Sequence, residues 1–77
     1  MNIKRNVING GLYTVVEKGG QHYIFDLAYT FDHGVECMAF KCDEDGHVSS
    51  YEEVYVSFPR TVSEQNLEAC VNEFLAQ

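Results

Sequence analysis

The sequence has 77 residues, 45% of them apolar and 13% aromatic, which predicts a single domain over residues 1–77 with one core and argues against disorder. Residues 42–77 hold eight acidic side chains and one basic one, so the formal net charge of −7 falls entirely on the C-terminal half. Because this charge repels phosphates, direct binding to nucleic acid is not expected. No apolar run is long enough to cross a membrane.

The first half of the chain predicts two strands joined by a tight turn. Residues 12–17 form a β-rich run that ends at Lys18-Gly19-Gly20, a hairpin-type turn, and residues 3–8 are expected to add at most a short edge strand. The next segment alternates between large apolar and other residues with period 2. Its apolar face carries Tyr23, Phe25, Leu27, Tyr29 and Phe31. We expect this face to be the floor of the core.

A third strand is predicted at residues 35–42, after a turn at residues 32–34. An acidic turn follows at Asp43 to Gly46, and a three-residue loop there would place Val48 opposite Cys42. The fourth strand is expected within residues 48–58. Its alternation breaks at Ser49-Ser50, which predicts a bulge or kink at that point.

A helix is expected after Pro59. Ser63 is the predicted N-cap, while Thr61 and Glu64 form a competing capping box. Apolar side chains then recur on one stripe at helical spacing, namely Leu67, Cys70, Val71, Phe74 and Leu75. This amphipathic pattern predicts that the helix docks on the sheet.

The predicted fold class is therefore α+β, a two-layer, four-stranded antiparallel β-meander with one C-terminal helix packed on one face (β-β-β-β-α). One helix cannot cover both faces of the sheet. The other face is expected to carry His22, Ile24, Ala28 and Cys37. Being half-polar, it is predicted to be available to a partner or to a second copy.

Histidine and cysteine side chains raise the question of a metal site built from His33, Cys37, Cys42 and His47. Cys37 and Cys42 are five residues apart on one strand, so their thiols should point to opposite faces, and zinc is not expected. The acidic turn fails as a calcium loop because Lys41 occupies the position of the first carboxylate. Cys42 and His47 lack an orienting group and an oxyanion site. We expect no enzyme activity, metal or cofactor.

Several short motifs lie between residues 11 and 48. They are Gly11-Leu12-Tyr13, Phe25-Asp26 and Thr30-Phe31-Asp32-His33-Gly34-x-Glu36-x-Met38-x-Phe40-x-Cys42-Asp43-Glu44-x-Gly46. In these motifs the chain resembles small uncharacterised proteins carried by phages and prophages of Gram-positive bacteria. It departs from them at residues 51–58, which are more strand-like than their short acidic segment. The resemblance implies a mobile-element context and no particular reaction.

The leading hypothesis is a phage or prophage accessory protein that binds a host protein with a basic surface. Inhibitors of CRISPR effectors and other defence systems are one such class. The predicted partner-binding residues are Asp43, Glu44, Asp45, Glu52 and Glu53. Their role would be electrostatic complementarity to Lys and Arg.

The alternative hypothesis is a structural or homo-oligomerising module, in which the open sheet face or an edge strand pairs with a second copy. Small-ligand binding in a cleft between helix and sheet has no support, because a two-layer domain of this size leaves little room there. Three cysteines are an odd count, which favours reduced thiols in a cytosol. With the resemblance to phage proteins, the expected location is the cytoplasm of a bacterial host.

Overall fold

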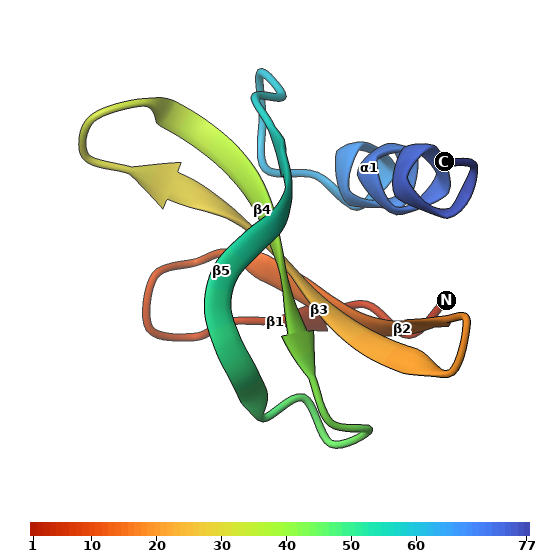
Figure 1. Cartoon of the computed structure of the whole chain (residues 1–77). Helices are drawn as coiled ribbons and strands as arrows, with labels where there is room; N and C mark the ends of the chain where they lie inside the picture. The colour runs from red at the N-terminus through yellow and green to blue at the C-terminus, as the bar shows by residue number, and fades with distance from the viewer.

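The computed structural model describes all 77 residues and contains five strands followed by one helix (Figure 1). The elements are β1 (Lys4–Arg5), β2 (Leu12–Lys18), β3 (Gln21–Thr30), β4 (Gly34–Cys42), β5 (Val48–Ser57) and α1 (Glu64–Leu75). The strands form one sheet in the order β1-β2-β3-β4-β5, and each neighbouring pair is antiparallel. The α+β class and the C-terminal helix are confirmed. The sheet has five strands rather than four, because Lys4 and Arg5 pair with Tyr13 and Leu12.

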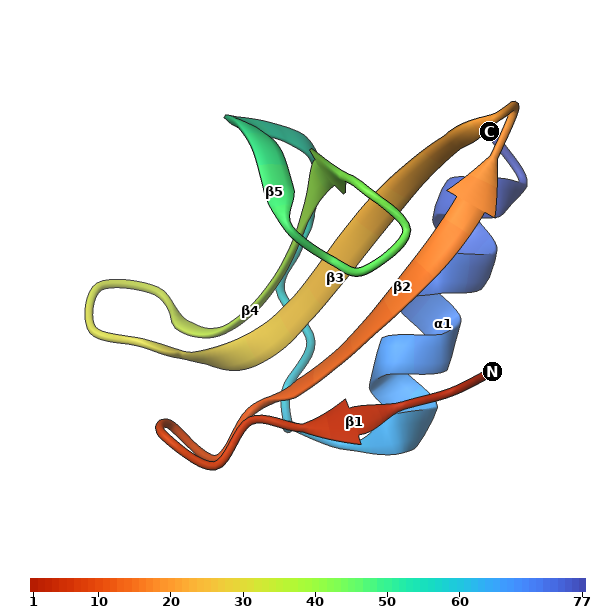
Figure 2. The ribbon, with the colours of Figure 1, turned by 90° about the horizontal axis from the view of Figure 1, so that it is seen from below.

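The helix α1 lies on one side of the twisted sheet, alongside β2 (Figures 1 and 2). Its buried side chains are Leu67, Cys70, Val71 and Phe74, four of the five apolar residues predicted for its stripe. The fifth, Leu75, is 41% exposed, because the apolar stripe turns away from the sheet in the last turn of the helix. At 12 residues, α1 is too short to cross a membrane.

The N-terminus of α1 is capped as the sequence predicts. The Ser63 Oγ accepts a hydrogen bond from the Asn66 backbone N–H at 3.2 Å. The competing capping box at Thr61 does not form, since the Thr61 hydroxyl accepts instead from the Asn66 side chain at 3.0 Å. Ser63 therefore fixes where the helix begins.

Aromatic side chains form the contact between the sheet and α1. The Phe74 ring meets the Tyr23 and Phe25 rings edge-on, with centroid distances of 4.9 and 5.4 Å. Tyr55 of β5 joins this group, and its hydroxyl donates to the Glu73 carboxylate on α1 at 3.0 Å. Burial of these rings is the main favourable term holding the helix on the sheet.

The core floor is shorter than the alternation in β3 predicts. Phe25 and Leu27 are fully buried, but Tyr29 is 70% exposed and Phe31 is wholly exposed. The hairpin between β3 and β4 extends beyond the area that α1 covers, on the side away from the helix (Figure 1). The prediction that Tyr29 and Phe31 belong to the core is therefore wrong, because the alternation sets the face of a strand but not how far the helix reaches.

Cys37 was expected on the uncovered face, and this expectation is also wrong. It pairs with Leu27 across β3 and β4, so it faces α1 and is fully buried. Burial raises the pKa of the Cys37 thiol, and the neighbouring Cys70 raises it further. Cys37 and Cys70 therefore act as small core residues.

The turn between β4 and β5 has the predicted three-residue loop. The Asp43 N–H donates to the His47 carbonyl at 3.0 Å, and Val48 lies opposite Cys42. The pairing then becomes irregular. Phe40 and Cys42 are two residues apart, whereas their partners Glu53 and Val48 are five residues apart. The predicted break in β5 near Ser49-Ser50 is confirmed.

Candidate binding surface

The face of the sheet turned away from α1, called the open face below, presents rows of directly opposed residues. One row crosses all five strands and consists of Lys4, Tyr13, Asp26, Met38 and Val56. The adjacent row consists of Val15, Ile24, Phe40 and Glu53. Opposed residues of an antiparallel sheet have their side chains on the same face. The open face is therefore largely apolar, with a carboxylate in each row and Lys4 at the β1 end of the first row.

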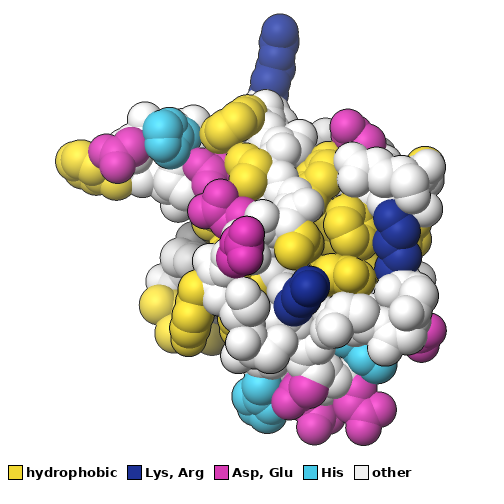
Figure 3. Space-filling model, viewed as in Figure 1, with side chains coloured by type: hydrophobic (Ala, Val, Ile, Leu, Met, Phe, Trp, Pro, Cys, Tyr) yellow, Lys and Arg dark blue, Asp and Glu magenta, His cyan; other side chains and the backbone are white.

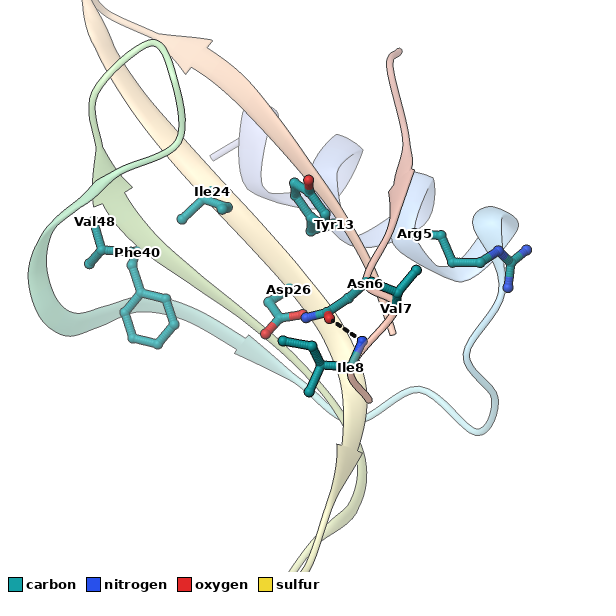
Figure 4. Close-up of a pocket in the computed structure, with 9 residues that line it drawn as sticks. All are labelled: Arg5, Asn6, Val7, Ile8, Tyr13, Ile24, Asp26, Phe40 and Val48. Carbon is teal, nitrogen blue, oxygen red and sulfur yellow. Dashed lines mark hydrogen bonds between the residues drawn. The ribbon is translucent and has the colours of Figure 1, made fainter. Parts of the chain in front are cut away.

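This face is hollowed into an apolar groove of about 420 Å³ (Figure 4). Its lining residues are Arg5, Asn6, Val7, Ile8, Tyr13, Ile24, Asp26, Phe40 and Val48. The segment after β1 forms one wall, where the Asn6 side chain accepts a hydrogen bond from the Ile8 N–H at 3.0 Å. Val7 and Ile8 are 91% and 93% exposed, so this wall presents unusually exposed apolar side chains.

Asp26 lies in the groove, at the centre of β3. Its Oδ1 is shielded from solvent and has no hydrogen-bond partner, and the carboxylate makes no ion pair. Burial raises the pKa of the Asp26 carboxyl above its ordinary value. A shielded carboxylate oxygen without a partner is costly, so Asp26 is the least satisfied polar group of the chain.

Glu36 adds a second carboxylate to the same region. It lies opposite Ala28, two residues along β3 from Asp26, and it is only 8% exposed. No lysine, arginine or histidine forms a salt bridge with it. The open face thus holds the shielded Asp26 and the largely buried Glu36, and neither pairs with a cation of the chain.

Asp26 was not among the predicted site residues. One signal in the sequence could have revealed it, because aspartate is disfavoured in strands and here occupies the middle of the most regular one. Asp26 lies on the face of β3 opposite to the large apolar residues, where a solvated side chain is expected. The groove around it combines residues of several strands with the segment after β1, and no periodicity predicts that arrangement.

The five predicted acidic residues, Asp43, Glu44, Asp45, Glu52 and Glu53, are all exposed. Asp43 is nevertheless engaged by its own loop. Its Oδ1 accepts from the backbone N–H groups of Asp45 and His47, each at 2.9 Å, and its Oδ2 lies 3.2 Å from the His47 Nδ1. The His47 backbone hydrogen bond is the main cause that lowers the pKa of the Asp43 carboxyl. Asp43 therefore shapes the loop.

Glu44 and Asp45 face a second depression, which we call the acidic hollow. It has a volume of about 460 Å³ and also contains Glu17, His22 and Lys4. Acidic side chains gather at the end of the molecule where the β4–β5 loop lies, beside histidine (Figure 3). Tyr13 lines both the apolar groove and the acidic hollow, so the two are adjacent.

The β4–β5 loop lies against the open face, as Figure 2 shows where it passes across β3. A Cβ on Gly46 would come within 3.2 Å of the Val15 Cγ2 and 3.7 Å of the Ile24 Cδ1. Gly46 also has a φ of +90°, a conformation that glycine adopts readily. This glycine allows the acidic loop to approach the apolar residues of the sheet.

The remaining two predicted residues lie on β5. Glu53 is opposite Phe40 and so belongs to the open face, whereas the register leaves Glu52 without an opposed residue. The structure thus places Glu53 next to the apolar groove. It places Glu44 and Asp45 at the acidic hollow.

The cysteine side chains considered as metal ligands or nucleophiles lie at separate places in the structure. Cys37 faces α1 and Cys42 faces the open side opposite His22, so the two thiols point to opposite faces, as predicted. Burial, and then the charge of Asp43, raise the pKa of the Cys42 thiol, which disfavours the reactive thiolate. Asp43, Asp45 and His47 have ligand atoms within 4.8 Å of one another, but all three are exposed.

Comparisons with protein-family models, with curated proteins and with solved structures find no match for this chain. The resemblance to phage proteins therefore depends on the sequence motifs alone. The chemistry of the apolar groove and of the acidic hollow remains as the guide to function.

Proposed function

We propose that this protein binds a partner protein with a basic surface, using the acidic side chains beside the open face. The observation that carries the proposal is the lack of internal charge compensation. The chain has 12 acidic and five Lys or Arg side chains, yet no Lys or Arg pairs with a carboxylate, and the one contact of this kind joins Asp43 to His47. The charges of the other carboxylates are therefore not compensated within the chain, and the exposed ones can attract a basic partner and speed its association.

Glu44, Asp45 and Glu53 are the residues best placed for this role. The first two are exposed on a loop whose shape Asp43 fixes, so their positions are preorganised. Glu53 lies across the open face from them, on β5. A preorganised group of carboxylates costs less ordering on binding than a flexible one.

The resemblance to phage and prophage proteins makes a bacterial host protein the proposed partner. A basic channel that normally holds nucleic acid is a surface of the required charge. An inhibitor of a host defence system, of the anti-CRISPR type, is therefore the proposed biological class. Its mechanism would be occupation of that channel by carboxylates in place of phosphates.

The alternative function, self-association, has one structural observation in its favour. The outer edge of β5 is unpaired over Val48–Ser57, and Tyr51 is exposed on it. Glu52 and Glu53 disfavour self-association through this edge, because two copies would bring like charges together along it. We therefore favour the basic partner.

Affinity capture from an extract of a Gram-positive bacterium, with salt elution, tests the proposal. The test variants are Glu44→Lys with Asp45→Lys, and Glu52→Lys with Glu53→Lys. The control is Glu64→Lys with Glu68→Lys, which makes the same charge change on the exposed side of α1. The expected result is a partner that elutes with salt, is retained by the control and is weakened by both test variants.

Two results would contradict the proposal. One is capture of the same partner by both test variants at low salt. The other is a dimer of this chain in sedimentation that salt does not dissociate, because that result favours self-association through the open face or β5.

A further inference from the structure

We infer that the apolar groove receives one lysine or arginine side chain of a partner polypeptide, whose charged group pairs with Asp26. This inference deepens the proposed function and rests on it. It names an anchor that the acidic residues alone do not supply.

The charge of the occupant follows from the two carboxylates. Asp26 and Glu36 lie on the open face with no counter-ion from the chain itself. The groove lining contains one cation, Arg5, whose side chain points away from Asp26 (Figure 4). Lys4, at the β1 end of the row of Asp26, lines the acidic hollow instead and makes no ion pair with Asp26. A cation that enters the groove would therefore meet an unpaired carboxylate, and a hydrogen bond between charged groups is among the strong ones.

The shape of the occupant follows from the groove walls. Tyr13, Ile24, Phe40, Ile8 and Val7 surround Asp26 with apolar surface. Lysine and arginine combine a methylene stem with a charged tip, so the stem can cover the walls while the tip reaches the carboxylate. A simple metal cation would leave these walls exposed, and an anion would be repelled.

A polypeptide fits better than an isolated small amine because the apolar surface continues past the groove. The row of Asp26 extends to Met38 and to Val56 on β5, and Val56 is partly exposed. On the other side, the groove shares Tyr13 with the acidic hollow. Residues that flank the anchoring side chain would cover the apolar row, and further basic residues would meet Glu44 and Asp45.

NMR titration of the ¹⁵N-labelled full chain tests this inference with two peptides. The first is acetyl-Leu-Lys-Leu-amide, and the second carries norleucine in place of the lysine. Saturable shifts are expected at Ile8, Tyr13 and Asp26, with the lysine peptide preferred by about tenfold, or one step of 1.4 kcal/mol.

Three variants separate the anchor from general effects. Asp26→Asn should abolish the preference for the lysine peptide, while Asp32→Asn, which removes the same charge from an exposed turn, should keep it. Ile8→Ser should weaken both peptides, and because Ile8 is 93% exposed this change leaves the core intact. Ile8→Ser therefore tests the groove even if Asp26→Asn fails to fold.

Equal binding of the two peptides, a preference that survives Asp26→Asn, or shifts confined to the acidic loop would each overturn the inference. The lack of any saturable shift at about 5 mM peptide would overturn it as well. Failure of the proposed function has a different signature. In that case the peptide preference at Asp26 persists, while charge reversal at Glu44 and Asp45 leaves capture of the protein partner unchanged.

Discussion

Lys18, at the end of β2, caps the last turn of α1 through Phe74. Its Nζ donates to the Phe74 carbonyl at 2.9 Å and to the Gln77 carbonyl at 3.0 Å, and it lies 4.6 Å from the centre of the Phe74 ring. The last turn of α1 contains no basic residue of its own. Lys18, 56 positions before Phe74 in the chain, therefore supplies the positive charge that the C-terminus of a helix favours.

Replacing Lys18 should weaken the docking of α1. Lys18→Met keeps most of the aliphatic stem but removes both hydrogen bonds and the cation–π contact, so we expect a loss of about 1–2 kcal/mol in the free energy of unfolding. Urea denaturation followed by circular dichroism measures this. Lys41→Met is the matched control, since Lys41 is exposed and should change stability by less than about 0.5 kcal/mol. Equal effects of the two changes would contradict the capping role.

Asp26 should destabilise the fold as the pH rises. Its pKa in the folded chain is raised above the ordinary 3.8, so its contribution to stability is fully present below pH 3.8 and is lost as the pH rises through the raised pKa. Asp26→Asn removes that loss. We expect the variant to match the wild type at low pH and to be more stable at pH 7 by up to about 1 kcal/mol, a value reduced by partial solvent screening.

Denaturation series from pH 3 to pH 8 would measure this difference for Asp26→Asn. Asp32→Asn, at an exposed turn, is the control and should show little change in stability. A constant difference between Asp26→Asn and the wild type across this range would show that ionisation of Asp26 costs nothing.

Asp43 should hold the β4–β5 loop in its shape. Its pKa is lowered, so the order that it confers is present above the ordinary value of 3.8 and is lost as the pH falls through the lowered pKa. Asp43→Ala should make residues 44–47 mobile at neutral pH, which ¹⁵N relaxation would detect. Glu44→Ala, which removes a carboxylate from the same loop, should leave them ordered. A rigid loop in Asp43→Ala would refute this role.

Gly11 should resist substitution because of its surroundings. A Cβ at this position would lie 2.8 Å from the Leu27 carbonyl oxygen and 3.0 Å from the Ala28 Cβ. Gly11→Ala is expected to cost about 1–3 kcal/mol, as overpacking of a well-packed site does. Gly19→Asn, at a turn with open space and a φ of +60°, should cost less than about 1 kcal/mol because asparagine tolerates that conformation. Thermal denaturation measures both variants. Equal midpoints would contradict the close approach of Gly11 to Leu27 and Ala28.

The candidate site was predictable only in part. The exposure of Glu44, Asp45 and Glu53 follows from their charge and from the turn signal at Asp45-Gly46. The sequence predicts Asp43 as a partner-binding residue, but in the structure the loop itself uses this carboxylate. A carboxylate next to backbone N–H groups in a tight turn is satisfied locally before a partner can use it.

The sequence by itself determined β2 to β5, α1 and most of their boundaries, whereas the pairing of β1 was not fixed by it. Turn glycines, the alternation in β3 and the cap at Ser63 act over a few residues, so their outcome depends little on the rest of the chain. Tertiary structure alone decided that Tyr29 and Phe31 stay exposed, that Cys37 faces α1, and that Asp26 is shielded in the apolar groove. These features depend on how far the helix reaches and on which distant residues meet, and local periodicity contains no information about either.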